Sequence, residues 1–105
     1  MKAIHLIQSD AKLAPKPVAP GSHLFESGFW SLSIKQAESL IGGNIFFHEK
    51  QLSPSFFGGV ITSYRVQQGG EWHGRVIFKF GSLVSHKGIR PKNPQGWNWV
   101  MNFEE

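Results

Sequence analysis

The sequence predicts an α+β fold: a small, mostly antiparallel and partly closed β-barrel of five or six strands with one short helix. The chain has 105 residues, 40% hydrophobic and 13% aromatic, which is enough for one packed core but not for two. Most apolar stretches are short, rich in aromatic and β-branched residues, and bounded by glycine or proline, as is typical of strands. Only one stretch has helical spacing. Closure of the sheet is favoured because it removes exposed strand edges.

The first 23 residues are expected to form a strand and a proline-rich arm, ahead of a single barrel domain over residues 24–105. Residues 2–8 alternate loosely around Ile4 and Leu6, which favours a short strand. Three prolines within six residues then exclude a helix or a central strand over residues 11–22.

The one predicted helix begins after a serine cap, either Ser33 or Ser31, and extends to about Ile41. Its apolar residues have the i, i+3, i+6, i+7 spacing of a single helical face. Gly42 is a suitable stop, because glycine adopts the backbone conformation that often ends helices. A strand over residues 44–48 follows.

The other strands are expected over residues 28–33, 59–66, 72–80 and 97–103. Alternation along the first of these places Phe29 and Trp30 on opposite faces. Residues 72–80 alternate most regularly. One face of that strand would carry Trp72, Gly74, Val76, Phe78 and Phe80, and the other His73, Arg75, Ile77 and Lys79. Residues 67–71 form a turn, and residues 81–96 a loop-rich segment.

Residues 42–65 contain two apolar runs, each opened by a Gly-Gly pair, around a polar connector that includes His48 and Ser55. The first pair is explained by the end of the helix. The second pair, Gly58-Gly59, opens a strand directly after Phe57, so it is either a bulge or a point where a ligand passes close to the backbone. We expect any specific site to lie near this connector.

Neither a metal site nor a cofactor is expected. A zinc-protease motif needs a second histidine three residues after Glu49, where the chain has Leu52, and the other histidines lack ligand spacing. On a strand, His48 and Glu49 point to opposite faces. The Gly-x-Ser-x-Gly motif is absent, so Ser53 and Ser55 are more simply explained as turn residues. We therefore expect a protein that is not an enzyme.

The chain is basic, with a formal net charge of +4. Its residues 72–103 include no acidic side chain but carry five Lys and Arg residues: Arg75, Lys79, Lys87, Arg90 and Lys92. Such a stretch can hold a polyanion through its phosphates, or it can be the ordinary solvated face of a small basic protein.

Aromatic residues exceed what one face of so small a core needs: Trp30, Phe46, Phe47, Phe56, Phe57, Tyr64, Trp97 and Trp99. Most are expected to fill the core, and two of Trp30, Phe57, Trp97 and Trp99 to reach a surface pocket. There they would stack on nucleobases, at roughly 1–3 kcal/mol per base.

No apolar run approaches the roughly 18–20 residues of a membrane span, and the N-terminus turns polar too soon for a secretory signal. Cysteine is absent, which excludes disulfides. We therefore expect a cytoplasmic protein with no membrane partner.

The order of elements resembles the PUA-like superfamily, in particular its EVE and ASCH branches, over about residues 24–103. The resemblance rests on the strand at Gly28-Phe29-Trp30, the helix to Ile41, and the strands beginning at Gly42, Gly58 and Gly74. Members of that superfamily look like small pseudo-barrels that bind RNA or modified DNA bases. In the EVE branch, a base lies in a pocket of aromatic and polar side chains beside a basic groove. This chain departs from the EVE pattern in its short length and its proline-rich N-terminal arm.

The resemblance implies a non-catalytic domain that binds RNA or DNA. Its ligand pocket would be formed by Trp30, His48, Ser55, Phe57, Gly58 and Gly59. Phosphates would be held by Arg65, Arg75, Lys79, Lys87 and Arg90. Two alternatives stay open. One is a protein-interaction or accessory module that self-associates through exposed aromatics, for instance as a dimer. The other is a hydrolase or deaminase that uses His48 together with Ser55.

Overall fold

The computed structural model describes residues 1–8 and 14–105, which form a small α+β protein with a mixed sheet. The strands are β1 (Ala3–Ile7), β2 (Lys16–Pro17), β3 (Leu24–Trp30), β4 (Asn44–His48), β5 (Phe57–Val66), β6 (Val76–Ser82) and β7 (Met101–Glu104). Within this part of the chain there is a single α-helix, α1 (Ile34–Ser39), and a short 3₁₀ helix, η2 (Val84–His86).

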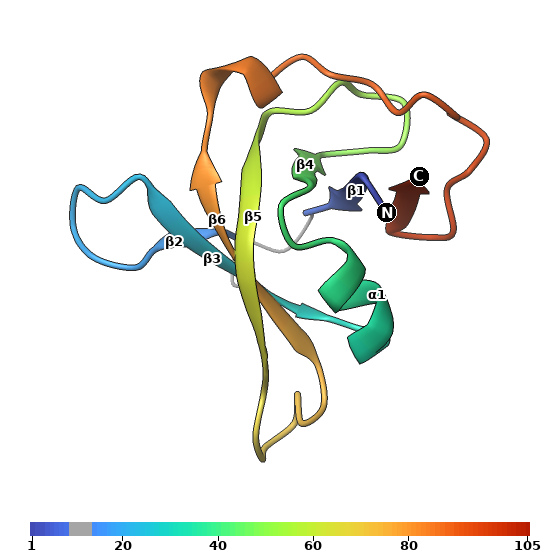
Figure 1. Ribbon diagram of the computed structural model, residues 1–105. Coiled ribbons are helices and arrows are strands. Elements are labelled where there is room, and N and C mark those ends of the chain that lie inside the picture. Colours follow the sequence, from blue (N-terminus) through green and yellow to red (C-terminus); the bar gives the residue numbers. More distant parts are fainter. Residues whose placement is uncertain (9–13) are drawn as a thin grey trace.

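All seven strands belong to one sheet, in the order β2-β3-β6-β5-β4-β1-β7. The pair β1–β4 is parallel, and the other neighbours are antiparallel. Strand β5 joins the two halves, because its first residues pair with β4 while its longer remainder pairs with β6. The sheet turns steeply there: β3, β5 and β6 run lengthwise in Figure 1, where β1 and β4 are seen almost end-on.

The predicted α+β class and the mostly antiparallel pairing are confirmed, but the barrel is not. Strands β2 and β7 form the two edges of the sheet, and in the described part of the chain the sheet does not close. Residues 1–8 and 14–105 contain seven strands in place of the five or six expected. The extra one, β2, is only two residues long and contains Pro17, which is tolerated because β2 is an edge strand.

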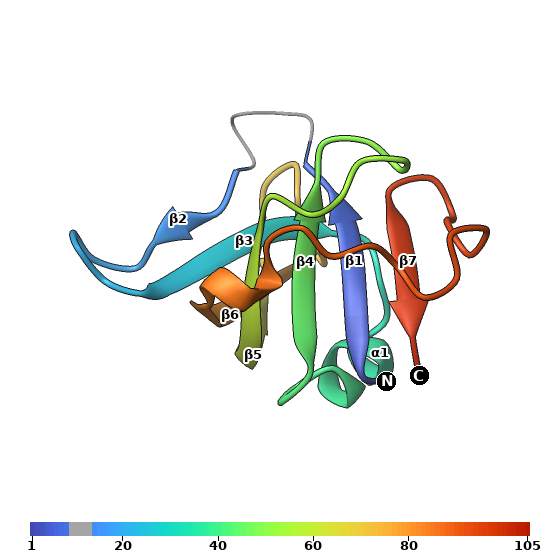
Figure 2. The same cartoon turned by 90° about the horizontal axis from the view of Figure 1, so that it is seen from above.

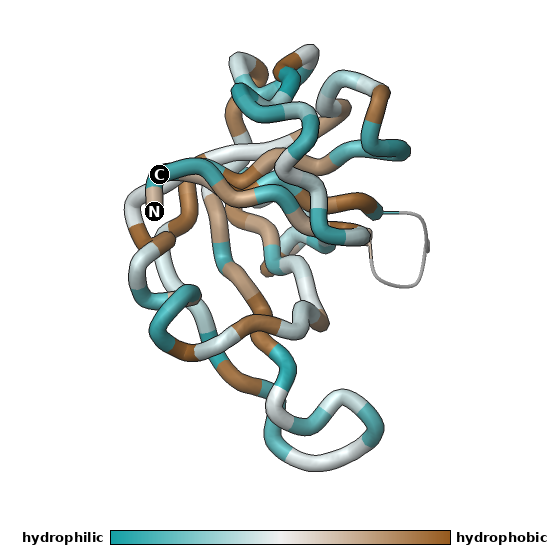
Figure 3. The backbone as a smooth tube through the Cα atoms, turned by 90° about the vertical axis from the view of Figure 1, so that its right-hand side faces the viewer, coloured by the Kyte–Doolittle hydropathy of each residue, from teal (hydrophilic) through white to brown (hydrophobic). Residues whose placement is uncertain are grey.

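The hydrophobic core lies on one face of the sheet. It contains Ile4 and Leu6 of β1, Ile45 and Phe47 of β4, and aromatic residues of β6, all nearly inaccessible to solvent. Helix α1 covers it with Ala37 and Leu40. Hydrophobic and hydrophilic residues alternate along much of the backbone in Figure 3, as expected of strands that bury one face.

The predicted helix is confirmed, with Ser33 and not Ser31 as its cap. The Ser33 hydroxyl accepts from the Gln36 N–H, and the Gln36 side chain accepts from the Ser33 N–H, which is a complete capping box. Gly42, at φ 83°, follows the end of the helix as expected.

Two predicted strands begin later than expected. Strand β6 starts at Val76 because residues 67–75 fold into a turn in which Gly69, Gly70 and Gly74 all have positive φ. Strand β7 starts at Met101 because Asn98 and Met101 exchange backbone hydrogen bonds around a tight turn. Trp99 lies in this turn at φ 58°. Residues alternate in both segments as they do in a strand, so strands were predicted where these turns lie. Strand β3, by contrast, begins at Leu24, earlier than predicted.

No helix in the described residues is long and apolar enough to cross a membrane.

Gly58 and Gly59 allow neighbouring strands to approach closely. A Cβ atom on Gly58 would lie 2.2 Å from the Ile45 carbonyl oxygen, and one on Gly59 would lie 1.9 Å from the Gly81 carbonyl oxygen. Both contacts are with backbone, which cannot move aside as a flexible side chain can. The glycines therefore sit where the sheet turns at β5, and the register shift of this strand falls later, between Ile61 and Ser63.

Replacing Gly59 by alanine is expected to destabilise the fold by about 3 kcal/mol, at the upper end of overpacking costs. Gly81→Ala is the matched control, since its Cβ would meet only side-chain atoms of His23 and Leu24 at 3.8 and 3.9 Å. Urea denaturation would measure both variants. A Gly59→Ala protein as stable as Gly81→Ala would contradict the close backbone approach.

Candidate functional site

Of the six predicted ligand-binding residues, all but Phe57 are buried. Trp30 is 6% exposed, faces the core, and donates its indole N–H to the Ser27 hydroxyl at 3.1 Å. His48 is fully buried on the opposite face of the sheet. Phe57 is half-buried and packs against Phe25, Phe47 and Phe80. The structure therefore does not bring Trp30, His48 and Phe57 together on one concave surface.

Ser55 fixes a long loop and has no free hydroxyl. Its Oγ donates to the His86 carbonyl oxygen and accepts from the Ile89 N–H, at 2.5 and 2.9 Å. Its backbone oxygen accepts from the Gly88 N–H at 2.7 Å. The side chain of His48 bonds other groups, so the arrangement contains no Ser55–His48 pair of the kind that a hydrolase would use.

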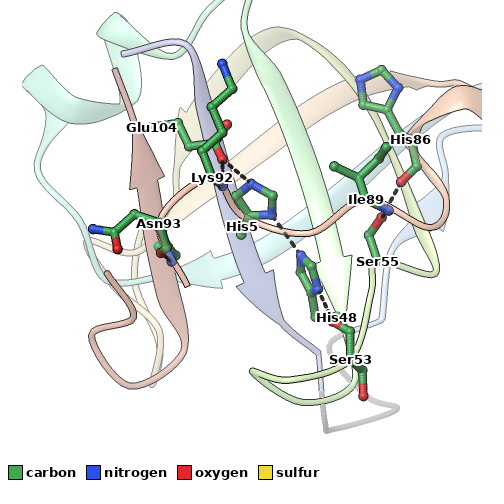
Figure 4. Close-up of polar contacts among 10 residues, drawn as sticks. His5, His48, Ser53, Ser55, His86, Ile89, Lys92, Asn93 and Glu104 are labelled. Carbon is green, nitrogen blue, oxygen red and sulfur yellow. Dashed lines mark hydrogen bonds and ion pairs between the residues drawn. The ribbon is translucent and has the colours of Figure 1, made fainter. Parts of the chain in front are cut away.

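The contacts of His48 belong to a buried relay that joins three strands (Figure 4). Parallel pairing of β1 with β4 brings His5 beside His48, and their Nδ1 and Nε2 atoms lie 2.8 Å apart. His48 Nδ1 lies 2.8 Å from the Ser53 carbonyl oxygen, and His5 Nε2 lies 3.1 Å from Glu104 Oε2 on β7. We call His5, His48 and Glu104 the relay.

An aromatic stack packs beside the relay. Phe46 lies between His5 and His86, with ring centroids 4.6 and 4.9 Å away and nearly parallel planes. Trp97 meets the rings of His5 and His48 edge-on. The loop of residues 83–100 supplies His86 and Trp97 and passes across β4 and β1, as Figure 2 shows. Burial lowers the pKa of His5, His48 and His86, and the Glu104 carboxylate opposes that shift at His5.

A substrate in solution cannot reach the histidines of the relay. Both histidine rings are inaccessible, and each ring nitrogen already faces a partner. Within residues 1–8 and 14–105, no group of three or more His, Asp or Glu side chains is placed to hold a metal ion. The arrangement can move or hold a proton, but it does not present a reactive atom.

The predicted phosphate-binding residues fall into two groups. Lys87 and Arg90 are exposed on the loop of residues 83–100, where Arg90 donates to the Leu52 carbonyl oxygen. Arg65, Arg75 and Lys79 belong to β5, β6 and the turn between them. The sequence suggested one basic surface, but the residues lie on two separate parts of the fold.

An open cleft of about 270 Å³ lies on the outer face of β2, β3, β5 and β6. Its lining includes the apolar residues Phe29 and Ile77 and the charged residues Lys16, Glu26 and Arg65. Arg65 pairs with Glu26, with its Nε atom 3.3 Å from Oε2. The cleft combines an aromatic ring, cations and a carboxylate acceptor.

Strand register explains why these side chains share a face. Glu26 lies opposite both Lys16 and Lys79, and residues opposite one another in an antiparallel pair point the same way. Arg65 lies opposite Ile77, which adds both to this face. Between Ser27 and Trp30 the register shifts, and Gly28 lies against the side chain of Ile77.

Aromatic residues extend the outer face beyond the cleft. Phe29 stacks on Trp72 with centroids 5.7 Å apart and planes 11° apart, and the Arg75 guanidinium lies 5.4 Å from the Trp72 ring centroid. Sequence reasoning chose Trp30 for this role and did not include Phe29, Lys16 or Glu26. Alternation did place Phe29 and Trp30 on opposite faces, so knowing that Trp30 is in the core would have indicated Phe29.

Comparison with known proteins gave no match: no family model fits the chain, and no curated protein or solved structure is significantly similar to it. The resemblance to the PUA-like superfamily therefore stays a prediction, and the site is interpreted from its own geometry.

Ser55→Ala is expected to destabilise the protein by about 1–3 kcal/mol, because it leaves the partly buried Ile89 N–H and the buried His86 carbonyl without their hydroxyl partner. Ser53→Ala is the control, since Ser53 contributes its backbone oxygen to the relay. Thermal unfolding would compare the two variants. Equal midpoints would show that the Ser55 hydroxyl does not hold the loop.

Proposed function

We propose that this protein is a non-catalytic domain that binds nucleic acid through the outer face of β3, β5 and β6. One observation carries the proposal: an aromatic and basic surface surrounds the Phe29 cleft. Bases stack on aromatic rings and on arginine planes whatever their sequence, and lysine and arginine hold the phosphate backbone.

The charges on this face favour a polyanion. Four cationic side chains, Lys16, Arg65, Arg75 and Lys79, lie in the cleft or next to it. Within the cleft lining the acidic residue is Glu26, and Arg65 already neutralises it in part. The exposed Glu71 lies in the neighbouring turn. Phosphates would therefore meet a net positive surface.

The cleft suits one unpaired base better than a duplex. An open volume of about 270 Å³ beside one aromatic ring offers a single stacking position. The Glu26 carboxylate accepts hydrogen bonds, as the exocyclic amino group of a base requires. On this view the protein is a PUA-like domain whose curled sheet is a partly closed barrel, with Phe29 in the stacking role that was predicted for Trp30.

A second function is favoured by Trp99, whose side chain is 85% exposed. It borders a cleft of about 350 Å³ between β7 and the start of α1, together with Leu32 and Val100. Exposed apolar surface next to a free strand edge is typical of contact sites, so we also propose self-association through this region.

Binding to short single-stranded RNA and DNA, measured by fluorescence anisotropy, is expected to weaken steeply with salt. Each phosphate contact on a single strand contributes a slope of about −0.7 in log K against log salt. Lys79→Gln is expected to reduce the magnitude of that slope by about 0.7, while Lys35→Gln on α1 leaves it unchanged. No binding at low salt would refute the proposal.

Phe29→Leu is expected to weaken single-strand binding by about 1–3 kcal/mol, because the stacking ring is lost. The matched control is Phe56→Leu, which alters an exposed phenylalanine outside the cleft. Circular dichroism would verify that both variants fold. If the two variants lost the same affinity, Phe29 would not be a stacking residue.

Sedimentation velocity over a range of concentrations tests self-association. If Trp99 forms the contact, the sedimentation coefficient rises with concentration for the unmodified chain and stays constant for Trp99→Ser. A concentration-independent monomer would rule out this second function.

A further inference from the structure

We propose that the relay of His5, His48 and Glu104 is a proton-operated latch, which holds the loop of residues 83–100 on the sheet and releases it when the relay takes up one more proton. The proposal concerns a different face from the Phe29 cleft and does not depend on nucleic-acid binding. It rests on the number of protons that the geometry of the relay can hold (Figure 4).

The closed relay contains three gaps between facing polar atoms, and each gap needs one hydrogen to form a hydrogen bond. The Ser53 carbonyl can only accept, so His48 Nδ1 carries a hydrogen. A neutral His48 then accepts at Nε2, so His5 Nδ1 must donate across the 2.8 Å gap between the rings. The third gap, between His5 Nε2 and Glu104, also needs a proton. Two neutral imidazoles supply two hydrogens, and His5 and Glu104 share the third.

In this closed state the His5–Glu104 pair has a net charge of zero. An imidazolium beside a carboxylate and an imidazole beside a carboxylic acid have the same net charge. The state is therefore compatible with complete burial of both rings, which disfavours isolated charge.

A further proton has no gap to occupy. If His5 and His48 each carried two hydrogens, two N–H groups would face each other across 2.8 Å, and a second positive charge would be buried. The two histidines can both hold two hydrogens only if their rings separate and water enters between them. Protonation is therefore coupled to opening.

Opening the relay would free the loop of residues 83–100, because relay residues make contacts that hold this loop on the sheet. Glu104 Oε2 accepts the Lys92 N–H at 2.8 Å as well as facing His5. Asn102, the neighbour of Met101 on β7, donates to the Asn93 carbonyl oxygen at 2.8 Å. Trp97 packs edge-on against both relay rings. Movement of the rings would disturb the Glu104 and Trp97 contacts directly, and Asn102 lies opposite His5 in the β1–β7 pair.

Among the other ionisable groups around the relay, Arg90 favours the same outcome. Arg90 on the loop repels added positive charge at His48 and lowers its pKa further. His86 lies across Phe46 from His5, the Lys92 side chain is exposed, and Glu49 and Lys50 follow His48 at the surface. The folded pKa of His48 lies below its ordinary 6.5, so the contribution of neutral His48 to the closed state is present above pH 6.5 and is lost as pH falls through the folded value.

Amide hydrogen exchange followed by NMR would detect the release. The Gly88, Ile89 and Lys92 amides report on the loop, and those of Tyr64 and Phe78 on the core. After correction for intrinsic rates, loop protection is expected to fall about tenfold or more between about pH 7.5 and about pH 5, while core protection stays constant. Constant loop protection would overturn the proposal.

His48→Gln tests the role of the relay, because an amide can donate to Ser53 and accept from His5 but cannot take up a proton. This variant is expected to keep the loop protected at about pH 5. The matched variants are His86→Gln, which removes the neighbouring ring of the stack, and His23→Gln, which alters an exposed histidine. If release of the loop at low pH disappeared in His86→Gln and persisted in His48→Gln, the proposal would be overturned.

A direct measurement on the unmodified chain covers the case in which His48→Gln does not fold. Nitrogen chemical shifts of the imidazole rings report which nitrogens carry hydrogen. His48 is expected to change from a single hydrogen on Nδ1 to hydrogens on both nitrogens over the pH range in which loop protection falls. A His48 ring that stays singly protonated through that range would contradict the proposal.

Discussion

The parallel register of β1 on β4 is the constraint on which both faces of the sheet depend. It places Ile4 and Leu6 beside Ile45 and Phe47 in the core, and His5 beside His48 on the other face. A slip of β1 by one residue against β4 would turn His5 into the apolar core and move Ile4 and Leu6 to the other face. Hydrophobic burial on one face and hydrogen bonding on the other thus specify the same register.

The face of the sheet that carries the relay contains buried polar atoms whose hydrogen bonding is incomplete. Trp97 Nε1 and Asn102 Oδ1 are buried and have no hydrogen-bond partner among the described residues. Buried polar groups without partners cost free energy, and the segments that contain them open more readily than a close-packed core does. Trp97 belongs to the loop of residues 83–100, and Asn102 lies where β7 contacts that loop, which is where the proposed release would begin. The core has aliphatic and aromatic packing instead and no comparable reason to open.

Local patterns in the sequence predicted what depends on neighbours in the chain. The Ser33 cap, the stop at Gly42 and the strand over residues 44–48 follow from short-range rules and are confirmed. Residues 72–75 and 97–100 alternate like strands, but turns with positive φ override the alternation. The relay joins residues 43 and 99 positions apart, so no local pattern indicates it. One signal was visible: each of the apolar segments around β1 and β4 contains a histidine on the face opposite its core residues.

The basic stretch over residues 72–103 shows why charge along a sequence is a weak guide to a binding surface. In the fold, Arg75 and Lys79 lie on the sheet, whereas Lys87 and Arg90 lie on the loop that covers the other face. Glu26, far away in sequence, lies directly opposite Lys79 and changes the character of that surface. What remains distinctive is the combination of Phe29, stacked on Trp72, with cations on both sides of a cleft. Net charge would attract any polyanion, but a flat aromatic ring beside a carboxylate acceptor discriminates in favour of ligands that carry bases, and this geometry gives the nucleic-acid proposal more support than the charge does.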